Sequence, residues 1–275
     1  MQKIKIPAKI NLTLDVTGQS GGYHTIDSLV CSVNLFDTVC VSKRNDDKIN
    51  LKTKGISPEC SIEQNNAYKT ALLFCEKENT NGVNITIKKN IPVANGLGGS
   101  SADVAGTLLA LKKLYRTDTD LSVLANAMGS DCNYMLGGGF ARLKGRGEEI
   151  TKLNGRKLYF VIIPSIEKIS AKDCYQTFDS LTEKPSPCTE LAIDYLLHDD
   201  FNSFAKTLKN DLYLPATKLC PSVKERIENS KQFGYPVMSG SGSAVYLVFR
   251  DKKSRNKAYR KLKKTHKKLI KAHTV

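Results

Sequence analysis

The segment that most constrains the fold reads Pro92-Val93-Ala94-Asn95-Gly96-Leu97-Gly98-Gly99-Ser100-Ser101-Ala102-Asp103. It follows an alternating apolar pattern over 83–88, typical of a strand, and it precedes an apolar helical pattern over 102–115. Glycines let backbone N–H groups approach a ligand closely, and a helix start adds unpaired N–H donors and the positive end of its dipole. Ser100 and Ser101 can cap this helix or donate to phosphate oxygens. The segment therefore predicts a phosphate-binding loop, although many glycine-rich turns have only a structural role.

The elements around this loop indicate an α+β protein. Strands and helices are mixed without a strict βαβ rhythm. A change in composition near residue 150 predicts two domains, 1–150 and 151–275. The expected strands are 11–16, 29–42, 83–88, 140–143, 158–163 and 244–249. The expected helices are 102–115, 121–128, 172–181, 188–197, 201–208 and 223–233.

Three further segments could carry chemistry. Pro7-Ala8-Lys9-Ile10-Asn11 places Lys9 and Asn11 on one face of a predicted strand, although such a lysine is usually a solvated surface residue. Gly129-Ser130-Asp131 could place a carboxylate in a site or simply cap a helix. Met238-Ser239-Gly240-Ser241-Gly242-Ser243 could be a second ligand-binding loop or a tight turn. The residues alone do not show that these segments meet.

The net charge of +15 is concentrated at the end of the chain. Residues 251–275 contain eleven Lys or Arg and one Asp, which supply +10. Tyr259, Leu262, His266, Leu269 and His273 recur at helical spacing, which predicts an amphipathic helix with a lysine-rich outer face. No set of stacking aromatics interleaves with the lysines, so a helix packed on the body is favoured over a nucleic-acid-binding segment.

The remaining bulk features exclude several protein classes. None of the eight cysteines forms a C-x-x-C pair, which argues against zinc ribbons and thioredoxin-like sites. Scattered cysteines without a secretory signal are typical of reduced thiols in a cytoplasmic protein, and most should be small buried residues. No uncharged apolar stretch reaches the length of a membrane span, and we expect no signal or transit peptide.

Together, the motifs resemble those of the GHMP small-molecule kinases. The resemblance rests on Pro7-Ala8-Lys9-Ile10-Asn11, Gly96-Leu97-Gly98-Gly99-Ser100-Ser101 and Met238-Ser239-Gly240-Ser241-Gly242, in that order. Within this superfamily, the chain resembles the 4-diphosphocytidyl-2-C-methyl-D-erythritol kinases over 7–249. The additional matching motifs are Gly22-Tyr23-His24, Asp27-Ser28-Leu29, Gly129-Ser130-Asp131, Gly145-Arg146-Gly147-Glu148 and Asn210-Asp211-Leu212.

This resemblance implies a two-subdomain fold and a specific reaction. It implies that 1–150 is an ATP-binding domain like domain 2 of ribosomal protein S5, and that 151–275 is a ferredoxin-like C-terminal domain. The implied reaction transfers phosphate from ATP, with Mg²⁺, to the 2-hydroxyl of 4-diphosphocytidyl-2-C-methyl-D-erythritol in the non-mevalonate isoprenoid pathway. We expect a cytoplasmic enzyme, either a monomer or a weak homodimer, with no membrane or nucleic-acid partner.

The resemblance also assigns roles to residues of this chain. Asp131 would take the proton of the substrate alcohol, while Lys9 would position that carboxylate and stabilise charge on the phosphoryl group. No residue is assigned as a metal ligand. The residues implied to bind ATP are Asn65, Lys89, Pro92, Val93, Ala94, Asn95, Gly96, Leu97, Gly98, Gly99, Ser100, Ser101, Ala102 and Asp103. The residues implied to bind the acceptor are Asn11, Tyr23, His24 and Tyr175.

The acceptor site is expected to hold cytosine between two aromatic rings. Tyr23 and His24 come from the Gly-Tyr-His motif, and Tyr175 is the candidate for the second ring. Stacking of a base between rings is a favourable geometry, but Tyr175 could equally be an ordinary core residue.

Some positions depart from the family pattern. Cys132-Asn133 replaces the usual Val-Pro, Ser100-Ser101-Ala102 replaces a third glycine and two serines, and Ser170-Ala171 replaces Ser-Thr. None of these differences removes a predicted catalytic group. The alternatives are another GHMP kinase with a mevalonate-type acceptor, an inactive relative, and a nucleic-acid-binding protein that uses its basic end.

Overall fold

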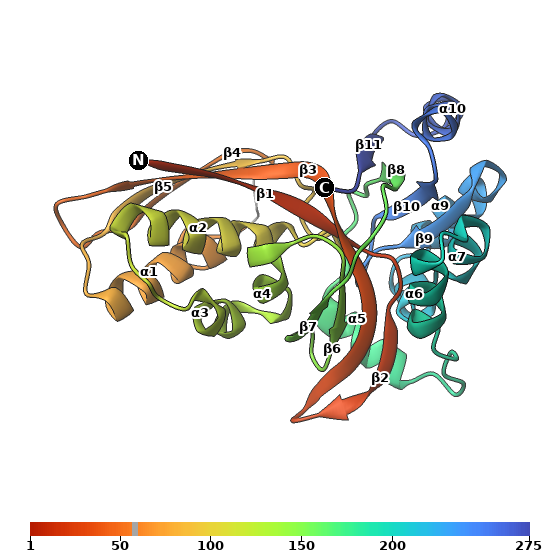
Figure 1. Cartoon of the computed structure of the whole chain (residues 1–275), viewed down its shortest axis with the longest axis horizontal. Coiled ribbons are helices and arrows are strands. Elements are labelled where there is room, and N and C mark those ends of the chain that lie inside the picture. Colours follow the sequence, from red (N-terminus) through yellow and green to blue (C-terminus); the bar gives the residue numbers. More distant parts are fainter. Residues whose placement is uncertain (57–59) are drawn as a thin grey trace. The chain divides into compact units, whose positions relative to one another are not determined.

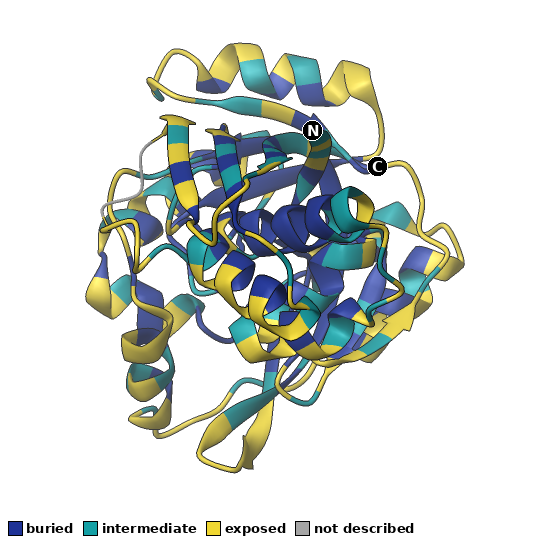
Figure 2. Cartoon of the chain, turned by 90° about the vertical axis from the view of Figure 1, so that its left-hand side faces the viewer, coloured by how far each residue is buried: buried dark blue, intermediate teal, exposed yellow. Residues whose placement is uncertain are grey.

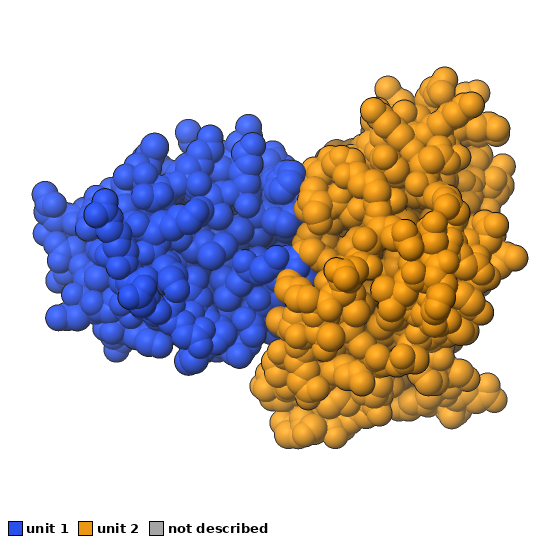
Figure 3. All heavy atoms as spheres, viewed as in Figure 1, with its two compact units in different colours: residues 1–8, 35–93, 98–138 blue, residues 9–34, 94–97, 139–275 orange. Residues whose placement is uncertain are grey.

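The computed structural model describes residues 1–56 and 60–275, which form two compact units (Figure 3). Unit 1 contains residues 1–8, 35–93 and 98–138. Unit 2 contains residues 9–34, 94–97 and 139–275. The expected boundary at residue 150 was based on composition, whereas these units are defined by compactness, and that boundary stays a prediction.

The sheet of unit 1 is organised around β5. Its strands are the first part of β1 (Gln2–Asn11), the second half of β3 (Tyr23–Lys43), β4 (Asn50–Gly55) and β5 (Val83–Lys89). β3 pairs with β5 in antiparallel fashion, and β4 pairs with β5 in parallel fashion. A parallel pair needs a crossover connection, and a helix between β4 and β5 supplies it.

Four helices line one face of these strands, as Figure 1 shows. They are α1 (Asn66–Glu78), α2 (Gly99–Tyr115), α3 (Leu121–Met128) and α4 (Ser130–Gly137). Alternate residues of β5, including Ile85 and Ile87, join Phe74, Leu108 and Leu111 of the helices in one apolar cluster. The side-chain period of two along a strand explains why every second residue of β5 enters this core.

Unit 2 contains a four-stranded antiparallel sheet in the order β11-β8-β10-β9. Its strands are β8 (Tyr159–Ile163), β9 (Tyr235–Met238), β10 (Val245–Phe249) and β11 (Ile270–His273). The first half of β3 and the strands β2 (Asp15–Ser20), β6 (Ala141–Lys144) and β7 (Glu149–Lys152) also belong to unit 2. Within this unit, β3 pairs with β2 and β6, and β6 pairs with β7.

The remaining helices all lie in unit 2. They are α5 (Ala171–Asp179), α6 (Thr189–Leu197), α7 (Phe201–Thr207), α8 (Tyr213–Leu219), α9 (Ser222–Ser230) and α10 (Lys252–Leu262), with a 3₁₀ turn over Lys231–Phe233. Val161 and Leu247 of the sheet pack against Ala258 and Leu262 of α10. Figure 2 shows buried residues gathered on the strands and on the inner faces of the helices.

The structure confirms most of the predicted elements and corrects two. The strand expected over 11–16 is interrupted, because β1 ends at Asn11 and β2 begins at Asp15. Its polar face is also buried: Thr13 Oγ1 contacts Thr189 Oγ1 at 2.7 Å, and Asp15 accepts the N–H groups of Cys188 and Thr189. Internal hydrogen bonds therefore replace the exposed polar surface that the alternation suggested.

The basic end of the chain is only partly helical. α10 stops at Leu262, and β11 pairs with β8 from Ile270↔Ile162 to His273↔Tyr159. The helical spacing of His266, Leu269 and His273 was therefore misleading, because their segment includes a turn and an edge strand. The packed-helix interpretation is correct for α10, whose Arg255, Ala258 and Leu262 are buried.

Two expectations from composition can also be compared with the structure. Six of the eight cysteines are buried, Cys40 is half-buried and Cys60 is exposed. Among the described residues, no helix is long and apolar enough to cross a membrane.

Candidate active site

The start of α2 offers unpaired backbone donors to an anion. Gly98 precedes the helix with φ 72°, a left-handed conformation that glycine adopts easily, and no side chain caps the helix. Within the described parts of the chain, the N–H groups of Gly99, Ser100 and Ser101 have no acceptor. These donors and the helix dipole suit the oxygens of a phosphate group. The alternative that Ser100 or Ser101 caps the helix is therefore wrong.

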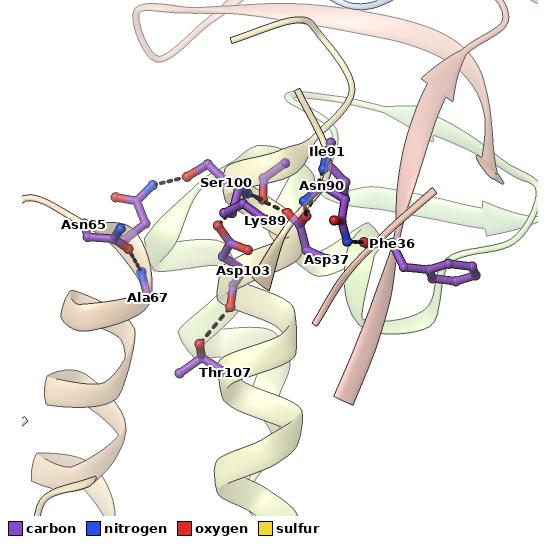
Figure 4. Close-up of polar contacts among 12 residues, drawn as sticks. Phe36, Asp37, Asn65, Ala67, Lys89, Asn90, Ile91, Ser100, Asp103 and Thr107 are labelled. Atoms are coloured by element: carbon purple, nitrogen blue, oxygen red, sulfur yellow. Dashed lines mark hydrogen bonds and ion pairs between the residues drawn. The ribbon is translucent and has the colours of Figure 1, made fainter. Parts of the chain in front are cut away.

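A buried ion network lies against the first turns of α2 (Figure 4). Lys89 Nζ donates to Asp37 Oδ2 at 2.5 Å, to Asp103 Oδ2 at 2.7 Å and to the carbonyl oxygen of Gly99 at 3.1 Å. Asp37 Oδ1 accepts the N–H groups of Asn90 and Ile91 at 2.6 and 2.9 Å. The network thus joins an interior residue of β3 and the last residue of β5 to the helix that follows the glycines.

The charges in this network are unequal, because two carboxylates share one ammonium. Burial raises the pKa of Asp103 to about 7, Lys89 opposes that rise, and the nearby Asp37 carboxylate reinforces it. Asp103 Oδ1 is buried and has no hydrogen-bond partner. All three N–H bonds of the Lys89 ammonium have protein acceptors, so this lysine holds the first turn of α2 in position. The implied contact of Lys89 with ATP stays a prediction.

Asn65 lies at the start of α1, close to the loop. Its side chain caps α1 by accepting the N–H of Ala67 at 2.9 Å. The next residue, Asn66, donates to Ser100 Oγ at 3.0 Å and so connects α1 with α2 (Figure 4). Asn66 also lines a cavity of about 540 Å³ that Leu72, Leu73 and Met128 border. The implied role of Asn65 in ATP binding stays a prediction.

Asp131 lies in the first turn of α4. Gly129 precedes this helix with φ 151°, and the side chain of Asp131 is half-buried. A carboxylate in the first turn of a helix lies near the positive end of the helix dipole. Asp131 is inside the helix, so the alternative that it is the N-cap is wrong.

In unit 2, four separate sequence segments meet around Asn11. Lys9 Nζ donates to Asn11 Oδ1 at 2.6 Å, and Asn11 Nδ2 donates to Ser28 Oγ at 2.9 Å. The backbone N–H of Asn11 donates to Ser239 Oγ at 3.2 Å, and Ser239 Oγ donates to the carbonyl oxygen of Gly96 at 2.9 Å. Parts of the first motif, the glycine loop and the late Gly-Ser loop are therefore in direct contact.

Close packing explains the glycine at position 96. A Cβ atom there would overlap the carbonyl oxygen of Ser239, and the backbone has φ 72°. Lys9 N–H also donates to the carbonyl oxygen of Leu97 at 3.0 Å. Gly96 thus serves the contact between two loops, whereas Gly98 serves the helix start.

The predicted acceptor residues form an aromatic group in unit 2. The rings of His24 and Tyr175 stack with centroids 4.7 Å apart and an interplanar angle of 22°. His24 Nε2 lies 2.7 Å from Asp179 Oδ1, and this contact lowers the pKa of Asp179. Tyr23 is 55% exposed, and the Arg146 guanidinium lies 3.8 Å from its ring centroid. Tyr175 was predicted as the second ring around cytosine. In this structure its ring stacks directly on His24, and its role in base binding stays a prediction.

Comparisons with known proteins identify the family. The model of the GHMP kinases N terminal domain matches residues 65–140, and that of the GHMP kinases C terminal domain matches residues 192–268. A 4-diphosphocytidyl-2-C-methyl-D-erythritol kinase of Clostridium perfringens (strain SM101 / Type A) is 34% identical, covering 96% of this chain and 94% of the relative. That of Clostridium beijerinckii (strain ATCC 51743 / NCIMB 8052) is 31% identical, covering 99% and 100%. The chain belongs to the 4-diphosphocytidyl-2-C-methyl-D-erythritol kinase family.

Solved structures agree with this family assignment. A 4-(cytidine 5'-diphospho)-2C-methyl-D-erythritol kinase matches with a TM-score of 0.83 and 28% identity, covering 98% of each chain. An L. major mevalonate kinase matches with a TM-score of 0.77 at 12% identity, covering 100% of this chain and 96% of that one, so it supports the fold alone. The α+β class and the two-subdomain GHMP kinase fold predicted from the motifs are confirmed.

The predicted site residues of this family member are divided between the two units. Lys9, Asn11, Tyr23, His24 and Tyr175 lie in unit 2, and Asp131 lies in unit 1. Of the predicted ATP-binding residues, 94–97 belong to unit 2, and the others belong to unit 1. The individual roles stay predictions.

Sequence reasoning did not single out two acidic residues of these groups. Asp37 holds Lys89, and Asp179 holds His24. Each is distant in sequence from its partner, and no local motif surrounds it. Only the folded structure shows that Asp37 on β3 and Asp179 on α5 contact these partners.

Proposed function

We propose that this protein transfers the γ-phosphoryl group of ATP to the 2-hydroxyl of 4-diphosphocytidyl-2-C-methyl-D-erythritol, a step of the non-mevalonate isoprenoid pathway. The observation that carries the proposal is the similarity of 31–34% identity over nearly the whole chain to relatives with this name. The contacts around the predicted loops and rings support it.

The start of α2 would bind the ATP phosphates. The free N–H groups of Gly99, Ser100 and Ser101 point to an anion there, and the Lys89 network keeps the first turn of α2 in place. Mg²⁺ would arrive with the nucleotide and neutralise phosphate charge. Phosphoryl transfer depends mainly on positioning and electrostatic stabilisation, so a rigid cradle of donors suits the reaction.

Asp131 and Lys9 would act on the acceptor. Asp131 would accept the proton of the 2-hydroxyl as its oxygen attacks the γ-phosphorus, and ADP would leave. Lys9 would stabilise negative charge on the transferring group. Asn11 would orient the acceptor, because its amide is already fixed by Lys9 and Ser28.

The aromatic group of unit 2 would bind the cytidine end of the acceptor. Tyr23 offers an exposed ring for stacking, and His24 offers a ring nitrogen whose orientation Asp179 fixes. Because Tyr175 already stacks on His24, it would support the histidine or exchange this contact for one with the base.

The test is ATP consumption by purified protein with Mg²⁺ and a single acceptor at a time. The acceptors are 4-diphosphocytidyl-2-C-methyl-D-erythritol, mevalonate and homoserine. We expect consumption only with the cytidine compound. Consumption with mevalonate or homoserine instead would assign another acceptor within the superfamily, and no turnover with any acceptor would contradict the kinase assignment.

A further inference from the structure

Arg146 is a charged residue that has no part in the proposed reaction. It lies in the turn between β6 and β7, within Gly145-Arg146-Gly147-Glu148. Its guanidinium lies over the Tyr23 ring, 3.8 Å from the ring centroid. The side chain is exposed, and among the residues that the structure describes it forms no ion pair.

The turn that carries Arg146 is held in place by its own contacts. Gly145 and Gly147 have φ values of 64° and 112°, which lets the chain reverse tightly. The Glu148 carboxylate accepts the N–H of Arg146 at 2.5 Å, and the carbonyl oxygen of Gly145 accepts the N–H of Ile26 at 2.7 Å. The turn is therefore fixed to β3 only three residues from Tyr23, and the guanidinium remains beside that ring.

A cation and an exposed aromatic ring side by side suit a nucleoside diphosphate, which has a base at one end and phosphate groups at the other. The ring can stack on the base, and a guanidinium can bind phosphate oxygens through two parallel hydrogen bonds. An exposed cation–π contact is weak, whereas charge-assisted bonds to a phosphate group are among the strong hydrogen bonds. A phosphate group near Tyr23 would therefore attract the guanidinium away from the ring.

We propose that Arg146 is a specificity-determining residue that binds the diphosphate of the acceptor, while Tyr23 stacks on its base. In the absence of acceptor, the guanidinium rests on Tyr23. On binding, it turns to the diphosphate and uncovers the ring. This inference rests on the proposed function and adds a recognition role for the diphosphate.

The first test uses ligands that need no catalysis. Titration calorimetry compares cytidine diphosphate with cytidine on the wild-type chain, on Arg146→Ala and on Arg146→Lys. We expect the wild-type protein to bind cytidine diphosphate more tightly than cytidine. Arg146→Ala should weaken cytidine diphosphate binding about ten- to a hundredfold and leave cytidine binding unchanged. The affinity of Arg146→Lys for cytidine diphosphate should lie between those of the wild-type protein and Arg146→Ala. Lys144→Ala is the matched control, because it removes an exposed positive charge from the same hairpin.

The second test uses turnover. In Arg146→Ala we expect a raised KM for the acceptor, an unchanged KM for ATP and a kcat within about twofold of wild type, since the residue contacts no reacting atom. If Arg146→Ala keeps the full preference for cytidine diphosphate over cytidine, or if Lys144→Ala loses as much as Arg146→Ala does, the proposal is overturned. A wild-type chain that prefers the diphosphate but phosphorylates no acceptor would contradict the proposed reaction and leave the role of Arg146 standing.

Discussion

Asp131 is the residue whose charge matters most to the proposed chemistry. It lies in the first turn of α4 and is half-buried. Asp131→Asn removes the proton acceptor but keeps the size of the side chain, so turnover should fall by at least about a hundredfold, the scale of a general-base contribution. ATP affinity should remain, since that affinity would come from the start of α2. Steady-state turnover and nucleotide titration measure the two effects separately.

Asp118→Asn serves as the control for this variant. Asp118 is exposed and lies in the turn between α2 and α3. It should retain wild-type turnover. Near-normal turnover in Asp131→Asn would refute the base assignment, and a parallel loss of ATP binding would indicate a structural role for Asp131.

Tyr23 provides a second test at the scale of single residues. Its ring is more than half exposed, so Tyr23→Ala should have little effect on folding and should remove a stacking surface. Loss of base stacking costs about 1–3 kcal/mol, so the acceptor KM should rise by roughly ten- to a hundredfold while kcat changes less. Tyr235→Ala, which removes another exposed tyrosine of unit 2, should leave both constants unchanged. An unchanged acceptor KM in Tyr23→Ala would argue against stacking.

Individual residues were predictable only where a motif surrounded them. The motifs singled out Lys9, Asn11 and Asp131 by type and order. They did not predict that Lys9 and Asn11 would be 5% and 3% exposed, because alternation along a strand indicates a shared face and not its surroundings. Burial of that face depends on Ser28 and Ser239, which lie 17 and 228 residues away from Asn11.

At the scale of elements, the buried carboxyl group of Asp103 on α2 makes the free energy of unfolding depend on pH. The raised pKa of Asp103, about 7, lies above the usual value for an aspartate. The folded state therefore holds this proton more tightly than the unfolded chain, and its stability advantage falls as pH rises from about 4 to about 7. Asp211, whose pKa burial raises to about 6, contributes with the same sign in unit 2.

Asp103→Asn should remove part of this pH dependence. Urea unfolding at pH 5 and pH 8 should show a smaller loss of stability in the variant than in the wild-type chain. Asp120→Asn is the control, because the pKa of Asp120 is lowered by the Ser122 N–H and its side chain caps α3. If Asp103→Asn and wild type lose equal stability between the two pH values, the buried network does not titrate in this range.

Helices and strands were predicted correctly where a hydrophobic pattern extended over many residues. The prediction failed where pairing with a distant strand determines the structure. α2 and β5 have sustained patterns that match their burial, and the structure places them within a few residues of the predicted bounds. β11 has only four residues, and it follows the lysine-rich helix α10 and a basic turn. Pairing with β8 determines that this segment is a strand, and that pairing could not be predicted from the local sequence.

At the scale of the whole molecule, the family fold was predictable because its motifs are widely spaced and ordered. They are separated by more than 80 residues at the first step and by more than 130 at the second. Their contact was not predictable from spacing, since physics alone suggested four separate segments. The structure joins Asn11, Gly96 and Ser239 through hydrogen bonds, which gives these distant loops a common structural role in unit 2.

The net charge of +15 should lower the stability of the fold, because many of the positive charges lie close together on α10. Lys253, Lys257 and Lys261 are exposed and follow one another at the i,i+4 spacing, where like charges repel by about 0.2–0.5 kcal/mol per pair. Lys257→Glu converts two repulsive pairs into two attractive ones and lowers the net charge of the chain. It should therefore stabilise the fold by about 0.5–1.5 kcal/mol at low ionic strength.

Salt and a matched variant separate this explanation from others. The gain should shrink in about 1 M salt, where the Debye length is near 3 Å, and kcat should be unchanged. Lys267→Glu makes the same charge change in the exposed turn after α10, outside any helix, and should give a much smaller gain. Equal gains from both variants would mean that net charge, and not the spacing along α10, limits stability. No gain from either would mean that solvent already screens this surface.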